Sequence, residues 1–246
     1  GYTSRGKQRY VFTWNHDKFP EPKKLLADFA KAGVRTVANL KPCLLDDHPA
    51  YAQLAADGAF VRDSHGDGVP CLEQFWDGWG AHLDFTRDGD RAWWQTKLQE
   101  QVLDIGIDVG WNDNNEYEIW GERALCYGFG QALPMTRAHA LQPLLMTRAT
   151  FDQQSRHHPN ERIYTITRGG PPGLQRYAQT WSGDNSTSWH TMRWNQRMAL
   201  TMSLSGLFNT GHDIGGFDGP VPDAEMLIRW TQACCLVPRM IMNSWK

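Results

Sequence analysis

The hydrophobic and polar positions along the chain repeat with two spacings, one typical of strands and one typical of helices. Short runs rich in β-branched and aromatic residues predict strands at residues 9–14, 34–40, 107–111, 162–167, 177–181 and 207–211, and the start of a last strand at 237. Between them, apolar residues three and four positions apart predict helices at residues 20–33, 87–106, 135–157, 189–206 and 222–236. The chain is therefore expected to consist of alternating strands and helices.

Such an alternation favours parallel βαβ units, which close either as a doubly wound sheet or as a (β/α)8 barrel. Neither G-x-G-x-x-G nor G-x-x-x-x-G-K-[ST] occurs in the sequence. Polar residues instead follow several predicted strands: Lys41, Asp113, Arg168, Asp184, His212 and Asp213. Because the carboxyl ends of barrel strands open onto one face, this pattern predicts an α/β fold of the (β/α)8 TIM-barrel type. Only six or seven strands can be counted, so we expect an incomplete barrel within residues 1–246.

Composition and charge exclude several classes of function. The chain has 246 residues, of which 41% are hydrophobic, enough to bury one sizeable core. Its formal net charge is −2, so no overall basic field attracts nucleic acid or an anionic membrane surface. No uninterrupted apolar stretch is long enough to predict a membrane span.

The five cysteines include no C-x-x-C pair, so the sequence predicts neither a disulfide framework nor a zinc site. Reduced thiols favour a cytoplasmic location, and a secreted or periplasmic one stays open. The 12 tryptophans suit either core packing or stacking on sugar rings.

Asp113 and Asp184 are the candidate catalytic pair. Each follows a strand-like run that contains tryptophan, and each is followed by asparagine. Two carboxylates that face a glycosidic bond can divide the work, because one attacks the anomeric carbon while the other protonates the leaving oxygen. Spacing alone leaves a second interpretation open, in which both acids lie on solvated loops.

Three sequence blocks carry a resemblance to a known family. "WNDNNE" (111–116), "ITRGGPPGLQRYAQTWSGDNSTSW" (166–189) and "GHDIGGFDGP" (211–220) resemble, in order, the signature blocks of glycoside hydrolase family 31. The similarity covers nearly the whole chain. The resemblance implies a retaining α-glycosidase whose catalytic (β/α)8 barrel occupies residues 1–246, without the flanking β-domains of the family. It implies no metal and no organic cofactor.

Carried over residue by residue, the resemblance implies that Asp113 is the nucleophile and Asp184 the acid/base. It implies that Arg168 hydrogen-bonds the sugar in the −1 subsite and holds nearby carboxylates, among them Asp113, in their charged form. Trp181 would pack the pocket wall, and Asp213 would support the pocket through Arg168. The remaining implied pocket residues are Trp111 beside the nucleophile, Glu116 in its loop, and His212 in the last block.

Three departures from the family pattern concern the sugar site. Asn114 and Tyr117 stand where the family usually has Met and Pro around an Asn-Glu pair. Asn243 stands near the place of a sugar-contacting His, and Lys41 precedes Pro42 where the family commonly has Asp. A Lys in the mouth of the barrel would donate hydrogen bonds where Asp accepts them.

Each substitution has a plainer interpretation as well. Lys41 could pair with Asp46 or Asp47 and take no part in the chemistry. Asn243 could be satisfied by backbone groups.

The predicted function is therefore that of a retaining exo-α-glycosidase acting on a terminal α-linked hexose of an oligosaccharide or α-glycoside, as an α-glucosidase does. The alternatives are α-galactosidase or α-N-acetylgalactosaminidase specificity on the same scaffold, and an inactive sugar-binding barrel fragment. The resemblance also implies that these residues belong to a larger polypeptide, whose remaining domains are partners of the barrel.

Overall fold

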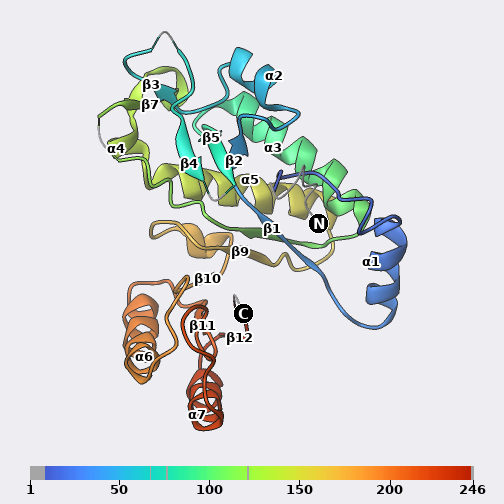
Figure 1. Cartoon of the computed structure of the whole chain (residues 1–246), viewed down its shortest axis with the longest axis vertical. Helices are drawn as coiled ribbons and strands as arrows, with labels where there is room; N and C mark the ends of the chain where they lie inside the picture. Colours follow the sequence, from blue (N-terminus) through green and yellow to red (C-terminus); the bar gives the residue numbers. More distant parts are fainter. Residues whose placement is uncertain (1–8, 67, 76, 121, 245–246) are drawn as a thin grey trace. The chain divides into compact units, whose positions relative to one another are not determined.

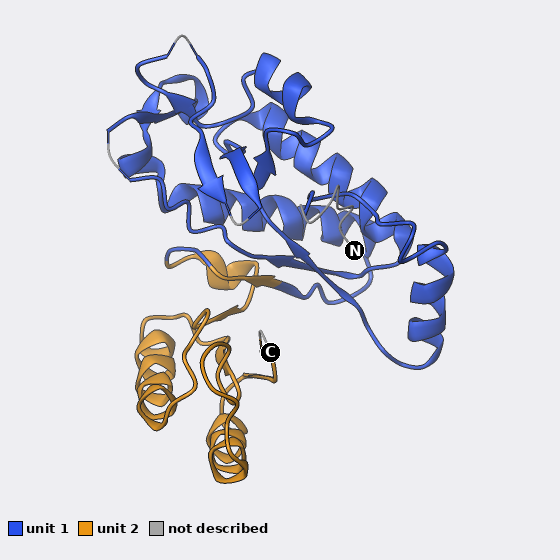
Figure 2. Cartoon of the chain, viewed as in Figure 1, with its two compact units in different colours: residues 1–165, 169–171 blue, residues 166–168, 172–246 orange. Residues whose placement is uncertain are grey.

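The computed structural model describes residues 9–66, 68–75, 77–120 and 122–244. The chain divides into two compact units, coloured separately in Figure 2. Unit 1 comprises residues 1–165 and 169–171, and unit 2 comprises residues 166–168 and 172–246. Each unit is described by itself below.

Unit 1 is built around a pair of parallel strands, β1 (Val37–Leu40) and β6 (Val109–Asn112), which lie beside each other in Figure 1. Helix α3 (Asp88–Gln101) packs against α5 (Leu141–His157), and α5 also contacts β6. Gly110 allows this close approach, because a Cβ at this position would lie 2.6 Å from Cγ2 of Thr150 in α5.

Two small antiparallel sheets are inserted into this parallel framework. The first has the order β2 (Cys43–Leu45), β5 (Gly78–His82) and β4 (Glu73–Phe75). The second has the order β3 (Arg62–Asp63), β7 (Ala124–Cys126) and β8 (Leu133–Pro134). The other unit 1 elements are α1 (Pro22–Lys31), α2 (Tyr51–Ala56), η1 (Leu103–Ile105), η2 (Gly128–Gly130) and α4 (Met135–Ala138).

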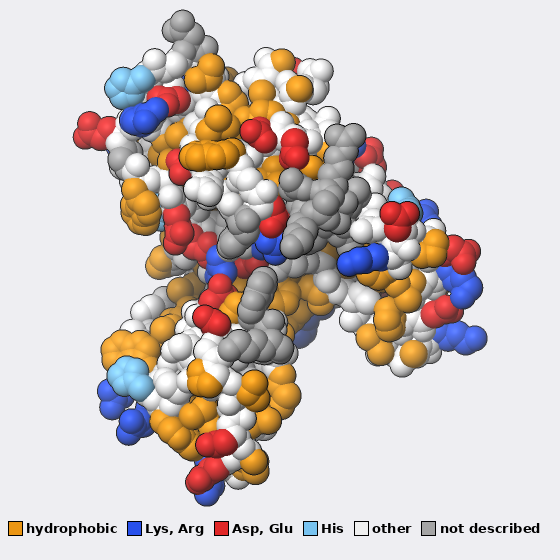
Figure 3. Space-filling view, viewed as in Figure 1, with side chains coloured by type: hydrophobic (Ala, Val, Ile, Leu, Met, Phe, Trp, Pro, Cys, Tyr) orange, Lys and Arg blue, Asp and Glu red, His pale blue; other side chains and the backbone are white. Residues whose placement is uncertain are grey.

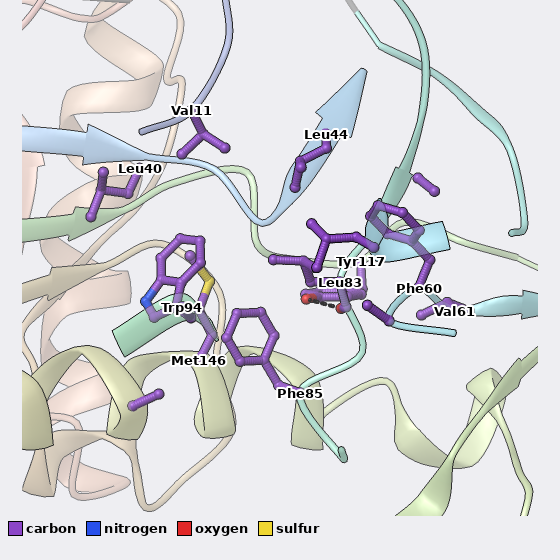
Figure 4. Close-up of a cluster of buried hydrophobic side chains, with 14 of the residues drawn as sticks. Val11, Leu40, Leu44, Phe60, Val61, Leu83, Phe85, Trp94, Tyr117 and Met146 are labelled. Carbon is purple, nitrogen blue, oxygen red and sulfur yellow. Dashed lines mark hydrogen bonds between the residues drawn. The ribbon is translucent and has the colours of Figure 1, made fainter. Parts of the chain in front are cut away.

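The core of unit 1 is rich in aromatic side chains (Figure 4). Trp94 of α3 is fully buried, and its ring lies edge-on to those of Phe12 and Phe85, at centroid distances of 4.7 and 5.4 Å. Its indole N–H donates to Oγ1 of Thr150 over 2.9 Å. Because this bond joins α3 to α5, the same tryptophan fixes both helices behind β6.

Unit 2 contains a parallel sheet with the order β10 (Thr180–Trp181), β11 (Thr210–Asp213) and β12 (Arg239–Ile241). Helices α6 (Trp189–Leu204) and α7 (Ala224–Cys234) follow β10 and β11. Each begins at a side-chain cap, since Ser188 Oγ accepts from Thr191 N and Asp223 Oδ1 accepts from Met226 N. The unit also includes η3 (Leu174–Arg176), and β9 (Thr165–Thr167) spans the boundary between the units.

Apolar side chains remain exposed on both helices of unit 2 (Figure 3). Leu204 at the end of α6 is 92% exposed, and Leu200 of α6 and Ile228 of α7 are also exposed. The buried cluster beneath the helices is small and includes Ile214, Met226, Trp230 and Cys234. None of the described helices combines the length and apolar character needed to cross a membrane.

The structure confirms most of the predicted alternation but corrects it at two points. The strand predicted at 9–14 is wrong, because Phe12 has φ 57° and the chain turns at Val11–Phe12. The antiparallel strands β2, β4, β5, β3, β7 and β8 were not predicted.

Replacing Trp94 with Ala is expected to destabilise the protein by about 3–5 kcal/mol, because it empties a fully buried site and leaves Thr150 without its donor. Urea denaturation followed by circular dichroism measures the change. Trp120→Ala is the matched control: its ring is 77% exposed, and its loss should change stability by no more than about 0.5 kcal/mol. Equal effects of the two substitutions would contradict the packing described above.

Candidate active site

The predicted nucleophile Asp113 lies one residue beyond the carboxyl end of β6. In the parallel register Leu40 of β1 is the partner of Asn112 of β6, and the ladder continues when Asp113 N donates to Leu40 O over 2.8 Å. This backbone bond places residue 113 beside residue 41, the first residue after β1. Both side chains therefore emerge at the carboxyl end of the parallel pair, where barrel active sites form.

The Asp113 carboxylate accepts hydrogen bonds from Asn39 of β1 and from Lys41, the residue that follows β1. Its Oδ2 accepts from Lys41 Nζ at 2.9 Å and from Asn39 Nδ2 at 3.0 Å. Lys41 also donates to Oδ1 of Asn114. The side chains of Lys41 and Asp113 are only 15% and 13% exposed, so little water screens their attraction. The partner that the structure gives Lys41 is thus Asp113, rather than Asp46 or Asp47 as the plainer interpretation supposed.

The loop after β6 is fixed by its own side chains. Asn114 and Tyr117 adopt positive φ angles of 50° and 56°. Asn115 is buried and its Oδ1 accepts from Gly169 N at 2.8 Å, while the Tyr117 hydroxyl donates to Leu83 O at 2.7 Å. Trp111 and Glu116, the other two predicted site residues here, are partly buried in β6 and in this loop. The polar residues of this loop therefore form an ordered turn.

The predicted acid/base Asp184 follows β10 in unit 2. Arg168 lies beside it, with Nη1 at 3.4 Å from the carboxylate oxygens. Gly183 makes the preceding turn with φ 73°, a left-handed conformation that glycine adopts readily. A Cβ at this position would lie 3.6 Å from Cδ of Arg168. The Asp184 side chain is 51% exposed, so this carboxyl group can exchange protons with water. Trp181, at the end of β10, is buried.

Asp213 at the end of β11 is fully buried and has two described partners. Asn243 Nδ2 donates to its Oδ2 at 3.0 Å, and Arg239 Nη1 lies 3.7 Å from its Oδ1. Burial raises the pKa of Asp213 to about 6, against the lowering effects of Asn243 and Arg239. The described donors to Asp213 come from β12 and the residues after it, and its expected action through Arg168 stays a prediction. Asn243 likewise binds a carboxylate, not the backbone.

Arg239 connects this buried acid to the tryptophan of β10. Its guanidinium carbon lies 5.1 Å from the centre of the Trp181 ring, close enough for a cation–π contact. His212 is fully buried, and its Nδ1 lies 2.9 Å from Oγ of Ser182. Burial lowers the pKa of His212 to about 4, so the ring is neutral at pH 7 and acts as a packing and hydrogen-bonding group.

A family model for the glycosyl hydrolases family 31 TIM-barrel domain matches residues 2–246. The chain belongs to glycoside hydrolase family 31. Its fold is accordingly that of the (β/α)8 barrel of this family, of which the chain forms a part.

The curated proteins similar to this chain include α-glucosidases. The chain is 30% identical over 236 residues to α-glucosidase 2 of Bacillus thermoamyloliquefaciens, covering 93% of this chain and 30% of that protein. It is 30% identical to an α-glucosidase of Saccharolobus solfataricus, covering 85% of this chain and 33% of that protein. The chain thus spans about a third of the length of these curated relatives.

Solved family 31 structures share the fold. A dextranase of Flavobacterium johnsoniae, complexed with glucose, superposes with a TM-score of 0.85 at 22% identity, over 95% of this chain and 30% of that chain. An α-xylosidase from a soil metagenome, complexed with xylose, gives a TM-score of 0.84 at 23% identity, over 98% of this chain and 36% of that chain.

Two polar residues of the site were missed by sequence reasoning. Asn39 of β1 stands two positions before Lys41, and because side chains alternate along an extended chain, the two lie on the same side of it. This period of two could have identified Asn39 as a second donor. Arg239 gave no comparable signal, since it falls inside an apolar run and its role depends on the pairing of β11 with β12.

The raised pKa of Asp213 predicts a pH effect on stability. Between its unfolded value of 3.8 and its folded value of about 6, the folded state holds a proton that the unfolded state has released, so stability falls as pH rises. The contribution lost is roughly 2–3 kcal/mol at most. Asp213→Asn should remove this part of the pH dependence, whatever its effect on overall stability.

Denaturant titrations of the wild-type protein and the Asp213→Asn variant at pH 4 and pH 7 measure the difference. The neighbouring groups Arg239, Asn243 and Asp184 are unchanged, so their contributions largely cancel in the comparison. Parallel pH dependences for the two proteins would contradict a protonated Asp213.

Proposed function

We propose that the protein is a retaining exo-α-glycosidase of the α-glucosidase type, with Asp113 as nucleophile and Asp184 as acid/base. The observation that carries this proposal is the Asp113 carboxylate, nearly buried at the carboxyl end of β6 and held by Lys41 and Asn39. A group held in this way is kept charged and correctly oriented, which a nucleophile requires. The names of the curated relatives support glucose as the sugar.

In the first step an oxygen of Asp113 forms a bond to the anomeric carbon while the glycosidic C–O bond breaks. The proton of Asp184 passes to the departing oxygen, and a glycosyl-enzyme ester results. In the second step Asp184 accepts a proton from water, the water oxygen bonds to the anomeric carbon, and the electron pair of the ester bond returns to Asp113. Two inversions retain the α-configuration.

The surroundings of the two acids suit these different roles. Asp113 has a cationic partner at 2.9 Å, which favours its charged form and offsets the cost of its low exposure. Asp184 is half-exposed and can receive its proton from water in each cycle. The α-galactosidase and α-N-acetylgalactosaminidase alternatives use the same pair of acids, and the names of the relatives do not favour them.

We also propose that the barrel works within a longer polypeptide. The curated relatives are about three times as long as the matched region. The exposed apolar side chains of α6 and α7 suit contact with such further domains.

The five cysteines are free thiols, in keeping with a cytoplasmic location.

Release of p-nitrophenol from α-linked glucoside, galactoside, xyloside and N-acetylgalactosaminide by the full-length protein tests the proposal. The glucoside should be cleaved best, and Asp113→Asn should lower kcat/KM by roughly 10³-fold or more, because the amide cannot attack. Asp57→Asn, at an exposed acid beside α2, is the control. Cleavage of none of the four, or full activity of Asp113→Asn, would reject the assignment.

The Asp184 role makes a separate prediction that depends on the leaving group. Asp184→Ala should retain most of its glycosylation rate with 2,4-dinitrophenyl α-glucoside, whose leaving group departs without a proton. It should lose about 10²–10⁴-fold with maltose, whose leaving alkoxide needs one. The ratio of the rates on the two substrates is measured for the variant and compared with the same ratio for the wild-type protein. A uniform loss on both substrates would show that Asp184 does not act as the acid.

A further inference from the structure

Lys41 forms the described ion pair with Asp113, the proposed nucleophile. Its Nζ lies 2.9 Å from Asp113 Oδ2 and also donates to Oδ1 of Asn114. One ammonium group thus touches the nucleophile and the residue that turns the chain after it. Among ion pairs between described residues of unit 1, this is one of the few in which both side chains are less than about a fifth exposed.

The charged groups around this pair belong to two neighbouring strands and to the start of the chain. Arg9 is paired with Asp77, through its Nε and Nη2 at 2.8 and 3.0 Å from the two carboxylate oxygens. The Cys43 thiol, two residues after Lys41, has a pKa raised to about 12 by burial, so it carries no charge at pH 7. The nearest described compensation for Lys41 is therefore Asp113.

Lys41 also lines a pocket in unit 1. Its walls include the side chains of Val11, Leu45 and Phe75, together with Lys41 itself and the Arg9–Asp77 pair. The Lys41 and Asp113 side chains are themselves little exposed, which makes the pull of the ammonium group on the carboxylate larger than in open water. Lys41 is thereby placed to act on the charge of Asp113.

We propose that Lys41 is a positioning residue that holds Asp113 as a carboxylate and promotes its departure from the glycosyl-enzyme. This inference rests on the proposed function, and it specifies a role for a residue at which the family commonly has an acid. Lys41 acts through Asp113 and forms no bond to the sugar carbon.

The charge on Asp113 changes during the reaction, and the effect of Lys41 follows from that change. The free carboxylate carries a full negative charge, the glycosyl ester carries none, and each transition state lies between the two. An adjacent ammonium group stabilises the carboxylate most, the transition states less and the ester least. Lys41 therefore lowers the barrier for hydrolysis of the ester, in which negative charge returns to Asp113.

Removing the ammonium group has two measurable consequences. The Asp113 carboxyl group should keep its proton to a higher pH, because an opposite charge at this distance favours the charged form by about 1–3 pH units. Ester hydrolysis should slow relative to ester formation by about tenfold. The glycosyl-enzyme should then accumulate in the steady state.

Lys41→Met in the full-length protein tests this, since Met has a similar length and no charge. Three quantities are measured: kcat/KM against pH, the burst of p-nitrophenol in stopped flow, and the mass of the protein after acid quench. We expect the acidic limb of kcat/KM to move up by about one unit, a burst of about one equivalent, and a mass increase of one hexosyl group. Lys41→Arg keeps a cation and should leave the acidic limb near its wild-type position.

Lys97→Met is the control, because it removes a partly exposed lysine that pairs with Glu100 on α3. An unchanged acidic limb with no burst in Lys41→Met would overturn the proposal, and so would a change in KM alone, which would make Lys41 a sugar-binding residue. Thermal unfolding of each variant verifies that it folds, and Lys41→Gln, which also removes the charge, replaces the Met variant if that variant does not fold. A wild-type protein that cleaves no α-glycoside would reject the proposed function itself.

Discussion

The ion pair between Lys41 and Asp113 constrains the arrangement of unit 1, because a carboxylate with so little exposure needs its partners in place. A carboxylate as little exposed as Asp113 costs several kcal/mol to desolvate unless an opposite charge and hydrogen-bond donors accompany it. The parallel register of β1 and β6 supplies both, since it sets Asn39 and Lys41 on the strand next to Asp113. That register in turn relies on α5 packing closely on Gly110, and on Trp94 joining α3 to α5.

Unit 2 also contains a buried carboxylate, Asp213, but its cationic partner lies farther away. Asp213 is more deeply buried than Asp113, and its cation Arg239 lies 3.7 Å away instead of 2.9 Å. Part of the Arg239 charge faces the ring of Trp181. Burial therefore outweighs attraction at Asp213, and its pKa rises to about 6. Two acids at the ends of parallel strands thus lie in different electrostatic surroundings, which the distance and number of their donors set.

The sequence predicted those parts of the structure that depend on local pattern. The helices and most parallel strands follow from periodicity, and Asp113, Asp184 and Arg168 follow from ordered motifs. The antiparallel strands, of two to five residues, are too short to show any period, and their pairing depends on contacts distant in sequence. The turn at Phe12 and the Arg239–Asp213 pair depend likewise on tertiary packing, which local propensity does not encode.

Two departures from the family pattern, Lys41 and Asn243, both contact a carboxylate. Lys41 binds Asp113 and adds a cation where the family commonly has an acid. Asn243 binds Asp213 with a neutral amide, whereas a His there could become charged and lower the pKa of the acid. One substitution thus favours the charged form of an acid, and the other withholds a charge that would do the same. Both residues therefore act on the charge of a carboxylate at the end of a parallel strand.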